Sequence, residues 1–238
     1  MLAQTNAIHR NTPDLLVRDS RGLAVRSVRY WRSAPTALAR SCIQRTLYSA
    51  LGHATCQWDP RLWELQQADS QTPASLTLLS SLGGQVLKSV SVDAGVYISL
   101  LGTAGQKMLT CDGRATQRVT AYDARLRPVT VHERAAGGDP VCTERFSYGG
   151  AEPANRLSNQ CGHLMRHDDP AGTLLFDAYN LRERCIAQTR HFTLASVAPD
   201  WPQDVSERDR LNEPGTGATT RWRFNPLDER LAQGRCRG

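Results

Sequence analysis

The residues with the clearest potential for chemistry lie between positions 159 and 177, where the sequence reads NQCGHLMRHDDPAGTLLFD. The stretch contains His163 and His167, followed directly by Asp168 and Asp169. Histidine and carboxylate side chains are common zinc ligands, and two carboxylates can also serve as acid and base in hydrolysis. The segment therefore suggests a metal site, a catalytic pair, or a purely structural role.

The spacing of these residues favours the structural role. In a strand, His163 and His167 share a face but lie ~13 Å apart, too far for two ligands of one zinc ion. Gly162 and Pro170 leave too few residues for a helix that would bring the histidines together. The two aspartates point to opposite faces of a strand, so they do not form a cooperating pair. We expect Asp169 to close a turn through its side chain.

Other candidate residues lack the setting that their chemistry needs. Ser80, Ser81 and Ser196 do not lie in a G-x-S-x-G motif. The glycines at 83–84 are not followed by the Lys-Ser/Thr of a phosphate-binding loop. Seven cysteines contain no C-x-x-C pair, which predicts reduced thiols, most of them in the core. The sequence thus predicts no catalytic, cofactor-binding or metal-ligating residue, and no enzyme.

Charge and hydropathy limit the class of partner. The formal net charge is +6, but the 27 arginines are scattered singly among acids, so we expect no nucleic-acid binding. The mean hydropathy is −0.45, and no apolar run is long enough to span a bilayer, so we expect no direct membrane contact. The N-terminus lacks the basic start and apolar stretch of a classical signal peptide.

Turn-like clusters recur along the chain, most of them with a glycine. Each leads into a short stretch such as PVTVHE at 128–133, which alternates polar and apolar residues. Glycine supplies the positive φ of a tight turn, and Asp or Asn closes it. The pattern predicts an all-β architecture of hairpins with little helix. Residues 38–47 are the best candidate for a helix and could equally form a strand. The glycine positions, or their substitutes, are Gly22, Gly52, Gly84, Gly105, Leu126, Gly162 and Asp228.

Composition divides the chain into three parts. Residues 1–197 carry the repeats, with a surface loop expected at 149–158. Residues 198–220 are rich in Pro, Gly and acids, which is typical of a long loop or linker. Residues 221–238 resume the strand pattern and are expected to be the truncated start of a further repeat.

Several ordered phrases resemble a known family. They include NTPDLLVRDSRGLAVRSVRYWR (11–32), GHATCQWDPRL (52–62), YDARLRPVTVHE (122–133) and CGHLMRHDDPAGT (161–173). The unit Tyr-Asp-x-x-Gly-Arg/His/Gln-Leu is the hallmark of RHS/YD-repeat proteins. In their residues and in their order along the chain, these motifs resemble the N-terminal part of the TcC-type component of bacterial insecticidal toxin complexes.

The resemblance implies a structural function. In that family, TcC and TcB wind their strands into a curved, hollow shell that encapsulates a toxic C-terminal domain, and TcB connects the shell to the pore-forming TcA. The resemblance thus implies a TcB-type partner, no cofactor, and export as part of a toxin complex without a classical signal, after a cytoplasmic stage. The family's self-cleaving core and toxin domain have no counterpart in this sequence, so we expect a truncated N-terminal piece.

Two alternatives stay open. Dispersed Asp and Glu residues could converge into the site of a hydrolase on a β scaffold. The module could instead bind carbohydrate or a cell surface, which would require an exposed row of aromatic side chains. If the chain is instead a segment of the shell, we expect it to have open strand edges and to aggregate when it is isolated.

Overall fold

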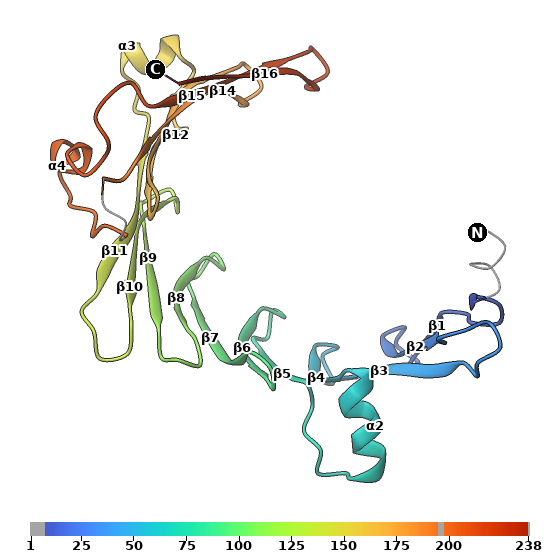
Figure 1. Cartoon of the computed structure of the whole chain (residues 1–238). Helices are drawn as coiled ribbons and strands as arrows, with labels where there is room; N and C mark the ends of the chain where they lie inside the picture. The colour runs from blue at the N-terminus through green and yellow to red at the C-terminus, as the bar shows by residue number, and fades with distance from the viewer. Residues whose placement is uncertain (1–7, 195–197, 238) are drawn as a thin grey trace. The chain divides into compact units, whose positions relative to one another are not determined.

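A computed structural model describes residues 8–194 and 198–237 of the chain. The chain forms two compact units by its own contacts: Met1–Gly105 with Thr110–Gly113, and Gln106–Leu109 with Arg114–Gly238. Each is built from short strands in sequence order, so the prediction of an all-β fold is confirmed (Figure 1).

In the first unit, each strand from β1 to β7 pairs antiparallel with the next. The β4–β5 ladder is the shortest, with two registered pairs, because helix α2 intervenes between these strands. The elements are β1 (Leu15–Arg18), β2 (Ala24–Trp31), β3 (Arg40–Tyr48), β4 (Ala54–Trp58), α2 (Pro60–Ala68), β5 (Leu76–Ser80), β6 (Val86–Ser91) and β7 (Gly95–Leu101).

The second unit continues in the same manner, and its neighbouring strands from β9 to β16 also pair antiparallel. Strand β8 (Lys107–Cys111) has residues in both units. The remaining elements are β9 (Gln117–Tyr122), β10 (Pro128–Arg134), β11 (Val141–Tyr148), α3 (Pro153–Leu157), β12 (Leu164–Asp169), β13 (Gly172–Tyr179), β14 (Cys185–Phe192), α4 (Val205–Asp209), β15 (Ala218–Phe224) and β16 (Arg230–Arg237).

One turn design joins most hairpins. The carboxylate of Asp123 accepts hydrogen bonds from the N–H groups of Arg125 and Arg127, at 2.8 and 2.9 Å. The fourth residue of the turn has a positive φ, which glycine adopts at no cost in four other turns of this length. Leu126 adopts it without being glycine, at 58°. The predicted turn positions are confirmed, since these residues have positive φ: Gly22, Gly52, Gly84, Gly105, Leu126, Gly162 and Asp228.

Tyrosines just before these turns connect successive hairpins. In each of four cases, the hydroxyl donates to the carbonyl of the residue that follows the preceding turn, at 2.7 to 3.1 Å. We call these bonds the tyrosine staples. They give the tyrosine before the turn a structural role, because each tyrosine anchors its hairpin to an earlier one; in the case of Tyr122 the next residue, Asp123, closes the hairpin itself. The pairs are Tyr48–Ala24, Tyr122–Lys107, Tyr148–Pro128 and Tyr179–Leu164.

The helices differ from expectation in detail. Residues 38–47, the best helical candidate, fall largely in β3, where they pair with β2 on one side and β4 on the other. The Asp59-Pro60 turn signal instead starts helix α2: Asp59 accepts from the N–H of Leu62, and Pro60 occupies the first turn. The loop expected at 149–158 contains the short helix α3.

The described residues bury little apolar surface. Only six apolar side chains are buried, whereas 26 large ones are exposed. A domain that buries its own core has a much larger interior than this. Cys142 is the single buried cysteine among those that the structure describes, so the expectation that most cysteines lie in the core was wrong. The buried apolar residues are Val28, Trp58, Val131, Cys142, Tyr179 and Trp201.

Candidate functional site

His163 and His167 contact different aromatic rings. His163 precedes β12 and stacks on Tyr179, with ring centroids 4.6 Å apart. His167 stacks on Phe146 at 4.4 Å, and its Nε2 lies 2.8 Å from a carboxylate oxygen of Glu144. Across residues 8–194 and 198–237, no three His, Cys, Asp or Glu side chains come together as a metal site would require.

Asp169 has the turn-closing role that the sequence predicts. Its carboxylate accepts from the N–H of Ala171 at 2.8 Å. It also forms a two-pronged ion pair with Arg190 of β14, at 2.8 and 3.0 Å. Asp169 therefore fixes the β12–β13 turn and connects it to the next strand, as a structural residue would.

Asp168 is the centre of a buried polar network that sequence reasoning missed. It is fully buried, and its carboxylate accepts from Arg166, Thr173 and Arg208. A buried carboxylate requires this degree of pairing, because removing a charge from water is costly. Arg166 also pairs with Asp209 at 2.6 Å. The signal in the sequence was an Arg-x-Asp alternation, which places both side chains on one face of β12.

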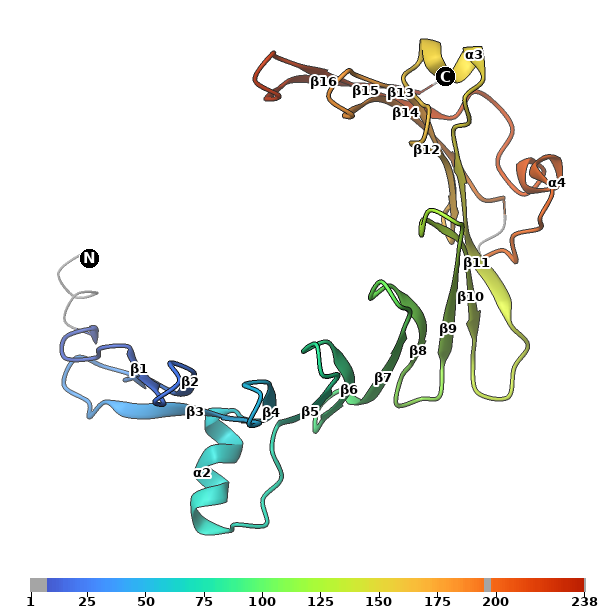
Figure 2. The ribbon, with the colours of Figure 1, turned by 180° about the vertical axis from the view of Figure 1, so that it is seen from behind.

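One partner of Asp168, Arg208, belongs to residues 198–213, which we call the strap. The strap leaves β14 and returns across β11 and β12, with α4 standing against these strands in both views (Figures 1 and 2). Trp201 is 1% exposed, and its indole N–H donates to the carbonyl of Asp169 at 3.2 Å. Its backbone N–H donates to Cys142 of β11 at 2.9 Å. The strap thus covers one face of the second unit's sheet.

Neighbouring carboxylates in both units lie on either side of a shared arginine. Arg118 contacts Glu133 and Glu144, both at 2.5 Å. Arg61 contacts two aspartates at 3.3 Å, and Arg166 contacts Asp168 and Asp209. A cation that two carboxylates share offsets one of their two negative charges, and its hydrogen bonds occupy an oxygen of each. This arrangement suits cross-strand connections and leaves no free acid–base pair at these three places.

Two of the three serines singled out in the sequence, Ser80 and Ser81, lie at a hairpin turn. Ser81 accepts from the backbone N–H of Gln85 at 3.2 Å, as a turn residue does. Ser80 ends β5, directly before that turn. Ser196 lies outside the residues that the structure describes.

The first unit has an apolar groove of about 610 Å³ between β3 and α2. Trp31 is 61% exposed beside it, and Trp63 of α2 also lines it. A sugar would need a free aromatic face. The guanidinium carbons of Arg26 and Arg45 already lie 5.7 and 5.1 Å from the centre of the Trp63 ring. The groove therefore offers one freely exposed aromatic ring and no exposed aromatic row.

Comparison with known proteins identifies the fold and the relatives. No protein-family model matches the chain. The toxin subunits YenC1 and YenC2 of Yersinia entomophaga are 29% and 28% identical over 201 and 210 residues, about four fifths of this chain. The chain is related to the TcC-type toxin subunits. It spans about a fifth of the length of these two relatives, 20% and 21%.

Solved structures of TcC-containing complexes have the same fold. The crystal structure of TcdB2-TccC3 matches with a TM-score of 0.85 and 24% identity, over 98% of this chain and 11% of that one. A Photorhabdus luminescens Tc holotoxin pore matches with a TM-score of 0.83 and 24% identity, over 95% and 11%. The RHS/YD-repeat fold that the sequence motifs imply is therefore confirmed. In the part of this TcC-related chain that the structure describes, no helix is long and apolar enough to cross a bilayer.

Proposed function

We propose that this chain is a non-catalytic wall segment of an insecticidal toxin complex, which contributes strands to a shell around a toxic polypeptide. One observation carries the proposal: within the residues that the structure describes, a long run of hairpins buries only six apolar side chains of its own. Strands of this kind need neighbouring strands to be stable, as in other repeat architectures. The relatedness to YenC1 and YenC2 supports the toxin-complex setting.

We also propose which subunit this chain binds and how it is exported. A TcB-type subunit would supply the neighbouring strands and connect the wall to a TcA pore, in a complex that is exported without a classical signal peptide. The proposed division of the chain is a wall segment at 1–197, a loop at 198–220 and a further strand region at 221–238. The strap lies within that middle segment, so its function is to brace the wall.

Co-expression with TcdB2, as a representative TcB-type subunit, tests the wall function. We expect the two chains to elute together at a fixed ratio and to protect each other from protease. If the chain stays separate, and instead hydrolyses glycosidic or peptide substrates, the hydrolase alternative replaces the wall function.

A further inference from the structure

A polar cavity of about 310 Å³ lies at the end of the strap. Its walls come from β12, β13 and β14, from the last residues of the strap, and from the loop that follows. Arg166, Thr173 and Asn212 line it and are only 8, 1 and 7% exposed. Ligand cavities are mostly apolar, with few polar groups. A cavity walled by buried polar side chains therefore selects a ligand with charged or hydrogen-bonding groups.

One buried acceptor in this wall lacks a donor. The side-chain Nδ2 of Asn212 donates to Oγ1 of Thr173 at 2.8 Å and to the carbonyl of Arg208 at 3.4 Å. The amide cannot be turned round, because Oγ1 of Thr173 already gives its proton to Asp168 and the carbonyl has none to give. Oδ1 of Asn212 is thus the acceptor, and it has no hydrogen-bond partner among the described residues. Because a buried acceptor without a donor is unfavourable, a donor that enters the cavity would stabilise this side chain.

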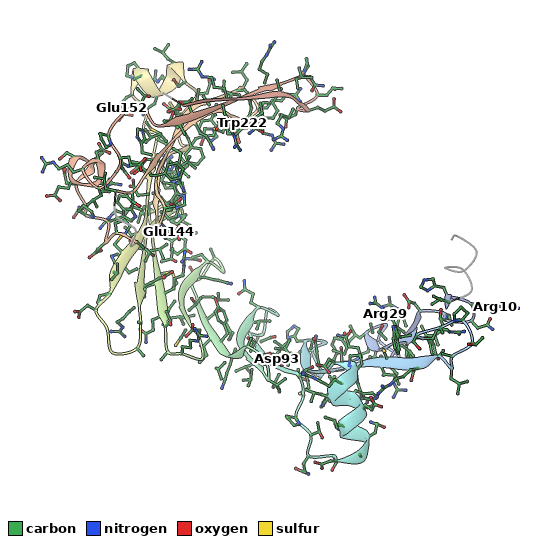
Figure 3. All side chains as sticks on the ribbon, viewed as in Figure 1. Arg10, Arg29, Asp93, Glu144, Glu152 and Trp222 are labelled. Atoms are coloured by element: carbon green, nitrogen blue, oxygen red, sulfur yellow. The ribbon has the colours of Figure 1, made fainter. Side chains whose placement is uncertain are left out.

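Two carboxylates stand at the same cavity. Asp209 forms an ion pair with Arg166, but its side chain is 59% exposed, so it can also meet a ligand. The carboxylate of Glu213 forms no hydrogen bond or ion pair with any described residue. Glu144 and Glu152 in the same unit, by contrast, accept hydrogen bonds from neighbouring side chains (Figure 3). Glu213 is therefore available to an incoming cation.

The charges around the cavity leave one negative charge without a counterpart. Two arginines and three carboxylates lie in the cavity wall or are bonded to it, and a ligand with a single positive charge would balance them. Across residues 8–194 and 198–237, no three His, Cys, Asp or Glu side chains gather as metal ligands would, so an organic cation fits better than a metal ion. The five charged residues are Arg166, Arg208, Asp168, Asp209 and Glu213.

The backbone holds the acidic wall of the cavity against the sheet. The N–H of Glu213 donates to a carbonyl of β14 at 2.8 Å. Gly217 lets the loop after the strap approach β14, since a Cβ there would lie 2.8 Å from the carbonyl oxygen of Arg190. Leu175 and Pro214 add apolar surface to the lining. The cavity thus combines a fixed carboxylate for a cationic head with an apolar surface for a hydrocarbon stem.

We propose that this cavity binds a guanidinium group, such as the one that an arginine side chain carries. Its planar fork of N–H donors fits the carboxylate of Glu213 through two parallel hydrogen bonds, and a further N–H supplies the donor that Asn212 lacks. The methylene stem lies along Leu175 and Pro214. An ammonium group has the charge but no such fork. The bound group links the strap to the sheet, and the site does not depend on assembly with other subunits.

Matched peptides test the site on the full chain by saturation-transfer NMR, which needs little protein. The probes are acetyl-Gly-Arg-Gly-amide and the same peptide with citrulline, which keeps the shape and loses the charge, or with lysine, which loses the fork. We expect the arginine peptide to bind about tenfold more tightly than either. Propylguanidine distinguishes the sources of the group: affinity equal to that of the arginine peptide assigns the site to small guanidinium compounds, and weaker binding assigns it to an arginine within a polypeptide.

A pair of glutamine variants locates the binding. Glu213→Gln removes the charge and keeps the size of the side chain, and it should weaken binding of the arginine peptide about tenfold. Glu207→Gln makes the same change at an exposed position of α4, on the strap but outside the cavity, and should bind like the parent. Equal affinity for the citrulline peptide, equal loss in both variants, unchanged binding in a folded Glu213→Gln, or no binding of the arginine peptide overturns the inference.

A second measurement needs no variant and decides the matter if Glu213→Gln does not fold, which circular dichroism reports. A ligand that binds only the docked strap stabilises it against local opening. The arginine peptide should therefore slow the cleavage of the strap by chymotrypsin, which does not cut after arginine, and the citrulline peptide should not. Equal cleavage in the presence of either peptide would show that no guanidinium site lies beneath the strap.

Discussion

A single side-chain oxygen at the start of the turn closes several hairpins of this type, and in the first of them it belongs to Asp19. In the turn at 123–127, the backbone N–H of Arg127 holds the pKa of Asp123 below its usual 3.8, against the effect of desolvation, with further hydrogen bonds from the Arg127 side chain and from Arg125. Asn180 and Asn225 perform the same backbone contacts in later turns. The hydrogen bonds therefore require an oxygen acceptor, and the negative charge adds to their strength.

Replacing Asp123 separates these two contributions. Asp123→Ala should destabilise the fold at every pH, whereas Asp123→Asn should retain most of the turn. Because the folded pKa is lowered, the advantage of Asp over Asn is fully present above pH ~4 and is lost as pH falls through the folded pKa. Urea unfolding at neutral and at acidic pH measures this. A constant difference between wild type and Asp123→Asn at all pH values would contradict it.

The tyrosine staples predict how much one tyrosine hydroxyl contributes to the free energy of unfolding. Burial raises the pKa of Tyr148, despite the nearby Arg127, and burial raises the pKa of Tyr179 to about 12. Both phenols thus stay protonated and donate. Tyr148→Phe removes one half-buried hydrogen bond to Pro128 and should lower the free energy of unfolding by about 1 kcal/mol.

A second phenylalanine substitution controls the first. The hydroxyl of Tyr30 forms no hydrogen bond to any described residue, so Tyr30→Phe should leave stability unchanged within error. Chemical denaturation compares the two variants. Equal losses in both would show that the staple bonds contribute nothing specific.

At the scale of elements, three hairpins after the first, whose turn follows Arg18, lack a staple. Ser80, Leu101 and Phe224 occupy the position before the turn where tyrosine stands elsewhere. Phe224 already has the ring and lacks only the hydroxyl. Phe224→Tyr should therefore donate to the carbonyl of Cys185 and stabilise the β15–β16 hairpin by about 1 kcal/mol. Slower amide exchange in β15 and β16 would report the new bond, and unchanged exchange would contradict it.

The strap depends on its buried ion pairs. Arg208→Ala leaves Asp168 fully buried with one of its two arginines removed, which should cost about 3 kcal/mol. It should also release the strap to protease. Arg210→Ala, two residues away at an exposed position, should do neither. Limited proteolysis with mass spectrometry measures both, and equal cleavage of the two variants would contradict a specific role for Arg208.

The elements that could be predicted from the sequence are those whose patterns involve residues close together in the chain. Turn glycines and alternating residues such as Val129 and Val131 depend only on neighbours in the chain, so the hairpins could be predicted. The buried network around Asp168 joins residues 40 positions apart, and the strap's return path leaves no periodic signal. Helix α2 was missed because Asp59-Pro60 can either end a strand in a turn or begin a helix.

At the scale of the whole chain, exposed strand edges should dominate solution behaviour. With six buried and 26 exposed apolar side chains, the described residues leave Leu16 and Val17 of β1 able to pair with another copy. We expect light scattering to reveal self-association that increases with protein concentration.

Lysine on an edge strand opposes such pairing, because the charge must be buried when a second strand adds. The double variant L16K/V17K should therefore stay monomeric at higher concentrations than the parent. L181K/V205K adds the same charge at exposed apolar positions away from β1 and should associate like the parent. If both variants reduce association equally, general repulsion accounts for the effect, and the open edge of β1 is not the surface through which copies meet.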